Sequence, residues 1–208
     1  MDPFGEINAS YTSLFEEFGD SANSVMIPKD NQELRFRSIA NHISKEETLS
    51  YLDYGSGLGH QYSFFVQNGY NKIRYHGVEI NSDFIEFSTA KYDGARFLSH
   101  KDFHQSTQTY DVTGAIGTFN LLYRTDQDPW DFVRSEIEFL WEKTNKSMFI
   151  NFMSTSVDYV QPGAYHQDLG VIYNYVTQNL TRKISIDSSY LPYEFTLVAC
   201  RKENCVHT

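Results

Sequence analysis

Three glycines follow a short apolar run in the stretch LSYLDYGSGLG, which covers residues 49–59. Gly55, Gly57 and Gly59 alternate with other residues, and Asp53 lies two positions before the first of them. Glycine lets the backbone approach a ligand closely because it carries no Cβ. Glycine-rich turns that follow strands are typical of sites for nucleotide-like molecules. This loop is therefore a candidate binding site, and the Asp53 carboxylate is a candidate ligand contact.

The spacing of these glycines disfavours two common phosphate-binding loops. The dinucleotide fingerprint is G-x-G-x-x-G, and aligning Gly55 and Gly57 with it puts His60 where the third glycine belongs. The P-loop pattern G-x-x-x-x-G-K-[ST] does not occur in the chain. A pyrophosphate also favours a helix N-terminus without a competing anion, whereas Asp53 lies beside this one. The loop therefore suits a ligand without a pyrophosphate.

The elements that must position this loop alternate between strands and helices. Apolar runs predict seven strands, at residues 49–53, 73–80, 95–98, 111–117, 147–154, 182–188 and 193–201. Helical periodicity predicts helices at residues 30–43, 60–69, 82–94, 129–141 and 169–180, after one or two N-terminal helices. Strands that alternate with helices form a parallel sheet covered on both faces. We expect a doubly wound, Rossmann-like α/β domain, mostly parallel, with an antiparallel C-terminal hairpin next to Pro192.

Composition favours one globular domain that acts on a small molecule. The chain has 208 residues, 40% of them hydrophobic, and a formal net charge of −10 from 17 basic and 27 acidic side chains. Tight nucleic-acid binding needs Lys and Arg to neutralise phosphates, so this balance disfavours nucleic acid. No signal peptide or membrane span is recognisable. The only cysteines, Cys200 and Cys205, indicate no metal site. We expect a cytoplasmic location.

The pattern Asp53–x–Gly55–x–Gly57–x–Gly59 resembles motif I of class I S-adenosylmethionine-dependent methyltransferases. That resemblance implies S-adenosylmethionine as cofactor and S-adenosylhomocysteine as product. It also implies that Asp53 organises the loop and faces the ammonium group of the cofactor. The loop residues Gly55, Ser56, Gly57 and Gly59 would then surround the cofactor.

A second motif follows 20 residues after Gly59, where Glu79 ends the predicted second strand. A carboxylate there can accept hydrogen bonds from ribose hydroxyls, as in dinucleotide-binding folds. This resembles motif II of the same family, which implies that Ile80 lies near the adenine. By the same resemblance, Asp102 would bond the adenine amino group, with Phe103 beside the ring.

The stretch YDVTGAIGTFNLL resembles the family motif that follows the fourth strand. It implies that Gly117, Thr118 and Asn120 lie near the sulfonium and the methyl acceptor. The [DN]-P-P-[YFW] motif typical of adenine, cytosine and glutamine amide methylation is absent. Both cysteines follow the last predicted strand or end it, so no cysteine is placed for C5-pyrimidine chemistry.

The N-terminal stretch FGDSANSVMIPKDNQELRF resembles small bacterial methyltransferases of surface-polysaccharide and small-metabolite pathways. It implies one domain over residues 1–208, with a helical lid or substrate segment at 1–45 and the Rossmann-like core at 46–208. Arg35 in this segment would pair with the cofactor carboxylate or an anionic substrate. The alternative is an exposed helix arginine.

These features predict methyl transfer to an oxygen or nitrogen of a small polar metabolite, such as a saccharide, a nucleotide-linked compound or a phosphate- or phosphoramidate-bearing precursor. A general base is needed only when the acceptor must lose a proton, and His166 and His104 are the candidates. Each is also readable as a surface or pocket-wall histidine. The alternatives are an RNA or protein methyltransferase and a silent cofactor-binding partner subunit. We expect a monomer or homodimer with no membrane contact.

Overall fold

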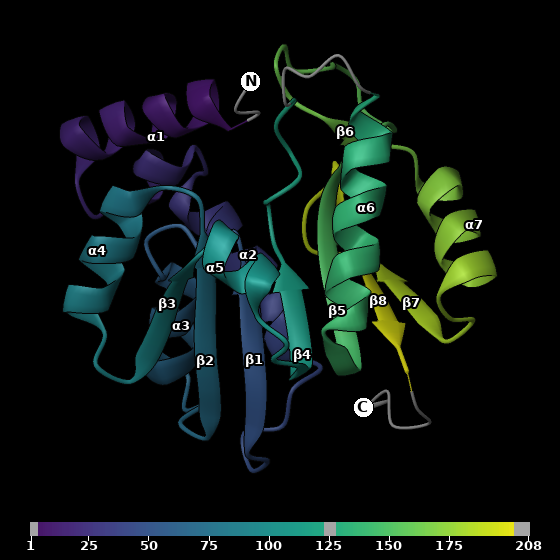
Figure 1. The fold of residues 1–208 in the computed structure, drawn as a ribbon. Coiled ribbons are helices and arrows are strands. Elements are labelled where there is room, and N and C mark those ends of the chain that lie inside the picture. The colour runs from purple at the N-terminus through teal and green to yellow at the C-terminus, as the bar shows by residue number, and fades with distance from the viewer. Residues whose placement is uncertain (1–3, 123–127, 202–208) are drawn as a thin grey trace.

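The computed structural model describes residues 4–122 and 128–201, which form one mixed sheet with helices on both faces (Figure 1). Cys205 lies outside these residues. The strands are β1 Leu49–Tyr54, β2 Ile73–Glu79, β3 Ala95–Ser99, β4 Tyr110–Ala115, β5 Thr144–Ser154, β6 His166–Gln167, β7 Ile184–Asp187 and β8 Glu194–Cys200. The helices are α1 Gly5–Phe18, the 3₁₀ helix η1 Ala22–Val25, α2 Lys29–Ala40, α3 His60–Gln67, α4 Ser82–Lys91, α5 His100–Gln105, α6 Pro129–Glu142 and α7 Leu169–Asn179.

The sheet has the strand order β3-β2-β1-β4-β5-β8-β7, and β6 pairs with β5 off this path. The first five strands run parallel, while β8 is antiparallel to both β5 and β7. The predicted parallel sheet and its C-terminal hairpin are therefore confirmed. The added strand β6 is only two residues long, which is too short for a periodic signal in the sequence.

Two apolar cores fill the two faces of the sheet (Figure 1). The larger core packs β-strand side chains against α6 and α7, with Ile137 and Ile172 fully buried. The other packs α2 and α3 against the opposite face, with Ile39 and Phe65 almost fully buried. Because both faces are covered, the residues left for a ligand are those at the ends of the strands.

The predicted starts of α3, α4, α6 and α7 at residues 60, 82, 129 and 169 are confirmed. Asn81, the residue before α4, caps it by accepting from the backbone N–H groups of Asp83 and Phe84. Asp30 and Glu33 have the spacing of a capping box in the sequence, but α2 begins after Pro28 with no side-chain cap. Helical periodicity places Val66 on the apolar face of α3, whereas the structure leaves it 45% exposed.

The N-terminal helix α1 lies beside α4 (Figure 1). Thr12 donates a hydrogen bond of 2.9 Å to Asp83 and accepts one of 2.9 Å from the side chain of Asn81. Phe15 packs edge-on against Phe84, with ring centroids 5.5 Å apart. These contacts hold α1 across the carboxyl end of β2. In the part of the chain that the structure describes, no helix has both the length and the apolar character to cross a membrane.

Candidate cofactor-binding site

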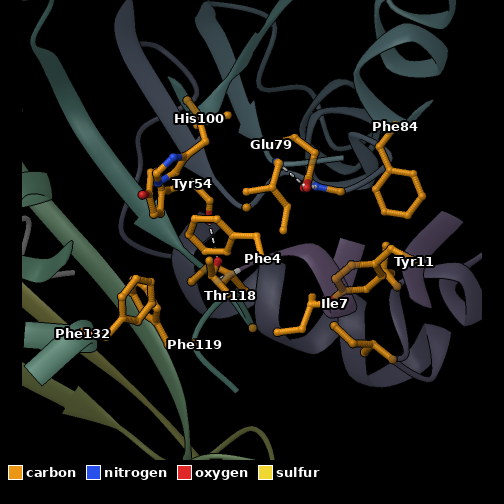
Figure 2. A pocket seen from close by; sticks show the side chains of 18 residues that line it. Phe4, Ile7, Tyr11, Tyr54, Glu79, Phe84, His100, Thr118, Phe119 and Phe132 are labelled. Atoms are coloured by element: carbon orange, nitrogen blue, oxygen red, sulfur yellow. Dashed lines mark hydrogen bonds between the residues drawn. The ribbon is translucent and has the colours of Figure 1, made fainter. Parts of the chain in front are cut away.

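A cavity lies at the carboxyl ends of β1, β2 and β4 (Figure 2). Open α/β sheets bind ligands at this edge, because the loops there diverge on either side of the sheet. Six of the residues expected around the cofactor line the cavity. They are Gly55, Gly57, Glu79, Ile80, Gly117 and Thr118. The motifs that are far apart in the sequence are therefore brought together.

The carboxylate of Glu79 is held in a fixed orientation by three backbone N–H groups. Its Oε1 accepts from Ile80 at 2.7 Å and from Asn81 at 3.0 Å, and its Oε2 accepts from Gly57 at 2.8 Å. A carboxylate has about four acceptor sites, two on each oxygen. Oε2 therefore keeps one acceptor site for a ligand hydroxyl, and it faces the cavity with the rest of the side chain (Figure 2).

Burial raises the pKa of the Glu79 carboxyl above its ordinary value, against the opposing effect of the three backbone donors. Those donors are matched to the ionised carboxylate, which can only accept hydrogen bonds. Tyr11, contributed by α1, also lines the cavity. Burial first, and then the charge of Glu79, raises the pKa of the Tyr11 hydroxyl above its ordinary value. Tyr11 therefore remains a neutral hydrogen-bond donor at the cavity wall.

The glycine loop has a backbone that other residues would strain. Gly55 has φ 79° and Gly57 has φ 53°, in the left-handed region that side chains with a Cβ avoid. The backbone N–H groups of Gly55 and Ser56 both donate to the carbonyl of Val78, at 2.8 and 3.0 Å. A Cβ on Gly55 would also lie 2.6 Å from the side chain of Thr118. The loop is thus tied to β2 on one side and packed against the loop after β4 on the other.

Substituting Gly55 with alanine should destabilise the protein more than the same change at Gly69. Gly69 also has a positive φ, 83°, but no atom lies within 4 Å of its missing Cβ. Each variant incurs about 1–2 kcal/mol of left-handed strain, and Gly55→Ala adds the collision with Thr118. Chemical denaturation of both variants measures the difference. Equal losses in the free energy of unfolding would contradict the close packing described here.

Asp53 lies on the other side of the glycine loop from Glu79. It lines a smaller hollow that shares Gly55 and Gly57 with the main cavity and also includes Ser56 and Arg35. The side chain is only 4% exposed and accepts a short hydrogen bond from the hydroxyl of Tyr75. The Oγ of Ser56 is buried and has no hydrogen-bond partner among the described residues. The two hollows present one carboxylate each.

Burial raises the pKa of Asp53 to about 7, against the opposing hydrogen bond from Tyr75 and with a further increase from the charge of Glu79. In the unfolded chain an aspartate titrates near roughly 3.9. Between these values the folded protein binds more protons than the unfolded chain, so the free energy of unfolding falls as pH rises from about 4 to about 7.

The variant Asp53→Asn should lose this pH dependence, because an amide does not titrate. Urea denaturation at pH 5 and pH 8 measures the effect. The wild-type protein should lose more stability between the two values than the variant does. The same change in both proteins would show that Asp53 does not titrate in this window.

Arg35 is buried in an ion pair that the sequence did not reveal. Its Nε and Nη2 donate to the two carboxylate oxygens of Glu194 on β8, at 2.6 and 2.5 Å. Arg35 is 7% exposed, so the alternative reading as an exposed helix arginine was wrong. A Cβ on Gly117 would lie 2.9 Å from Nη1, which places that nitrogen beside the loop after β4. Its pairing with a cofactor carboxylate stays a prediction.

Asp102 and Phe103 do not line the cavity, although the family resemblance implied that both lie at the adenine. Asp102 is exposed and pairs with Ser99, whose Oγ donates to its carboxylate at 2.7 Å. Phe103 is fully buried in the core under α6. The reason is that α5 begins at His100, directly after β3, so the turn of the helix carries both side chains away from the cavity. His100 lines it instead.

Neither Asn120 nor His166 lines the cavity. The side chain of Asn120 accepts from the backbone of Met153 at 3.0 Å and therefore joins the loop after β4 to β5. His166 lies on β6, where its Nδ1 is 2.7 Å from the carbonyl oxygen of Ser154. Gly59 does not line the cavity either, and it is the residue that precedes α3. These three positions serve local structure in the arrangement seen here.

The sequence did not identify the apolar part of the cavity wall. Aromatic and aliphatic side chains from α1, β1, α4, α5, α6 and the loop after β4 supply it, and Figure 2 shows them around the cavity: Phe4, Ile7, Tyr54, Phe84, His100, Phe119 and Phe132. A signal for the α1 contribution exists, because Phe4, Ile7 and Tyr11 have the spacing of one helical face. The other contributors come together only in the folded chain.

Comparison with known proteins finds structural likeness without sequence likeness. No protein-family model matches the sequence, and no curated protein matches it. Magnesium protoporphyrin IX methyltransferase from Synechocystis PCC 6803, solved with bound SAH, is similar with a TM-score of 0.68 and 15% identity over 97% of both chains. A TehB-like SAM-dependent methyltransferase from Corynebacterium glutamicum has a TM-score of 0.55 and 12% identity over 95% of this chain and 97% of its own.

A third similar structure is the plantazolicin methyltransferase BpumL, solved with a monoazolic desmethylPZN analog and SAH. Its TM-score is 0.59 at 12% identity, over 96% of this chain and 97% of its own. The chain therefore has the Rossmann-like fold of SAM-dependent methyltransferases, as the sequence motifs predicted. The magnesium protoporphyrin IX and plantazolicin methyltransferases are named for different acceptors, so the likeness extends to the fold and not to a substrate.

Proposed function

We propose that this protein is an S-adenosylmethionine-dependent methyltransferase that acts in the cytoplasm. The observation that carries the proposal is the placement of Glu79 and the glycine loop on one cavity at the carboxyl edge of the sheet. The fold is one that the similar structures use to bind SAM or SAH. The motif series in the sequence supports the same cofactor.

The residues present fit this cofactor. Glu79 has a free acceptor site for a ribose hydroxyl, and Ile80 lies beside it to contact an apolar base edge. The hollow on the other side of the loop contains Asp53, which suits an ammonium group, and Arg35, which suits a carboxylate. The hollows therefore match the adenosine and amino-acid ends of one extended ligand. When bound, S-adenosylmethionine supplies an electrophilic methyl group on a sulfonium.

We propose a small molecule with an oxygen or nitrogen acceptor as the substrate. The cavity wall that is left beyond Glu79 and the glycine loop is rich in apolar rings, among them Phe4, Phe119 and Phe132. Aromatic rings contribute to binding by stacking and by burying apolar area. This lining favours an acceptor with a flat or apolar part over a saccharide, which was one of the polar acceptors that the sequence suggested. Among the described residues that line this cavity there is no Lys or Arg to pair with the phosphates of RNA.

The catalytic contribution of the protein is positioning. Holding two reactants in line can supply on the order of 7 kcal/mol or more of the barrier, and methyl transfer from a sulfonium needs a base only for acceptors that must lose a proton. Of the catalytic residues predicted, Asn120 and His166 stand outside the cavity and Arg35 beside it. We therefore assign no general base.

An assay of S-adenosylhomocysteine release tests the proposed function. The protein is incubated with S-adenosylmethionine in parallel reactions, each of which contains one pool of candidate acceptors. The pools are fractionated metabolite extract, RNA and peptide mixtures. We expect release with an apolar metabolite fraction. Release of S-adenosylhomocysteine only with RNA, or only with peptides, would show that the acceptor is RNA or peptide and not a small molecule. Tight cofactor binding without release in any pool would favour a silent partner subunit, and the matched variant for this assay is Glu79→Ala.

A further inference from the structure

Two histidines and a glutamate come together between α5 and α6. His100 and His104 are four residues apart on α5, and their rings lie 4.2 Å apart. The Oε2 of Glu136 on α6 is 3.9 Å from Nε2 of His100 and 3.6 Å from Nε2 of His104. The three ligand-type atoms all lie within 4.8 Å of one another. From the sequence, His104 was a candidate general base and not a candidate metal ligand.

The cluster adjoins the cavity through His100, and its carboxylate is buried. Glu136 is 8% exposed, and Tyr54 donates a short hydrogen bond to its carboxylate. His100 and Tyr54 both line the cavity (Figure 2). The Nε2 of His100 is buried and has no hydrogen-bond partner among the described residues. Burying a carboxylate and an imidazole nitrogen that makes no hydrogen bond costs free energy, and a cation held between the two groups would offset that cost.

The geometry is that of ligands around one metal ion. With metal–nitrogen and metal–oxygen distances of about 2.0–2.2 Å, neighbouring ligands of a tetrahedral site are roughly 3.4 Å apart. The distances from Oε2 of Glu136 to the two imidazoles are longer than this by a few tenths of an ångström, and all three ligand atoms lie within 4.8 Å of one another, so the side chains must draw together to bind one ion. Two histidines at positions i and i+4 of a helix can both face one ion, as in zinc enzymes.

We propose that His100, His104 and Glu136 bind one divalent transition-metal ion, with Zn²⁺ as the best-suited ion. Imidazole ligands favour zinc and its transition-metal neighbours over magnesium and calcium, which prefer oxygen. Three protein ligands leave a fourth position for water or for a ligand atom, and this is the ligand set of zinc sites that are not purely structural. Because His100 lines the cavity, the fourth position lies at the cavity wall. The hydroxyl of Tyr54 donates to Oε2 of Glu136 and lies 3.2 Å from Nε2 of His104, so it is part of the same cluster.

Calorimetry with Zn²⁺ on the untagged full chain, after removal of metal with a chelator, tests this site. We expect one ion per chain, with an affinity that falls more than about tenfold in His104→Ala, because even the loss of a residue that only supports a ligand costs about 10- to 100-fold. Titration with Mg²⁺ should show no binding. Visible absorption of the Co²⁺-loaded protein gives a second readout of two imidazole ligands, and it should change in His104→Ala.

His42 provides the matched control, because its ring packs against Phe149 in the other core of the sheet. The variant His42→Ala should bind Zn²⁺ as the wild-type chain does. The side chain of His104 is 31% exposed, so His104→Ala should keep the fold, and thermal melting checks that it does. Absence of Zn²⁺ binding at millimolar concentration, or equal affinity in wild type and His104→Ala, would overturn the proposal. In that case the cluster is an ion pair between Glu136 and protonated histidine. Neither result bears on cofactor binding, which is measured separately.

Discussion

Replacing Arg35 with alanine should lower the free energy of unfolding by about 3–5 kcal/mol. The change removes one partner of a buried ion pair and leaves the Glu194 carboxylate, 8% exposed, with no guanidinium beside it. Asn151, which donates to Glu194 at 3.0 Å, cannot neutralise that charge. Urea denaturation monitored by circular dichroism measures the loss.

Arg37 on the same helix is the matched control. It is exposed, so Arg37→Ala should change stability by less than about 0.5 kcal/mol. The double variant Arg35→Ala/Glu194→Ala should recover part of the loss, because it removes the unpaired charge as well. A loss below about 1 kcal/mol in Arg35→Ala would show that the pair is open to water in solution and that Arg35 is available for an anionic ligand.

Replacing Glu79 with alanine should weaken binding of S-adenosylmethionine by about 1.5–3 kcal/mol, which is the scale of a hydrogen bond to a charged group and corresponds to roughly 10- to 150-fold in the dissociation constant. The variant removes the acceptor for the ribose. It also leaves the backbone N–H groups of Gly57, Ile80 and Asn81 without the acceptor that Glu79 provides, so the glycine loop loses one of its contacts with the end of β2. Calorimetry on folded variant protein gives the affinity.

Asp102→Ala provides the control for this experiment, because Asp102 is a second carboxylate near the same edge of the sheet but exposed and paired with Ser99. Its removal should leave the cofactor affinity unchanged. If Asp102→Ala weakened binding as much as Glu79→Ala does, the adenine contact implied by the family resemblance would hold and α5 would have to rearrange on binding. Unchanged affinity in Glu79→Ala would remove Glu79 from the site.

The sequence predicted the fold well because the strands of a covered parallel sheet are continuous apolar runs. The predicted ends of β1, β2 and β4 lie within one or two residues of the observed ends. Each of these strands is a short run that is bounded by turn signals, which is how a buried strand is recognised in a sequence. Helix α5 was missed because six residues, HKDFHQ, span less than two turns and carry no periodic face. Because α5 was not predicted, Asp102 and Phe103 were assigned to the cofactor site, whereas the structure places both on this helix and outside the cavity.

The site was predictable where one local motif defines the backbone and unpredictable where distant residues meet. The glycine loop and Glu79 were found because their spacing is fixed by one strand, one helix and the next strand. The partner of Arg35 could not be found, because Glu194 lies 159 residues further along the chain. The cluster of His100, His104 and Glu136 left a partial signal, the i, i+4 spacing of the two histidines, but its glutamate comes from another helix.

Direct calorimetry of S-adenosylmethionine and S-adenosylhomocysteine against the wild-type chain tests the central claim, that the two hollows beside the glycine loop, one with Glu79 and one with Asp53, together bind this cofactor. We predict saturable binding of both ligands with one site per chain. Binding of neither at millimolar concentration would contradict the assignment, whatever the fold.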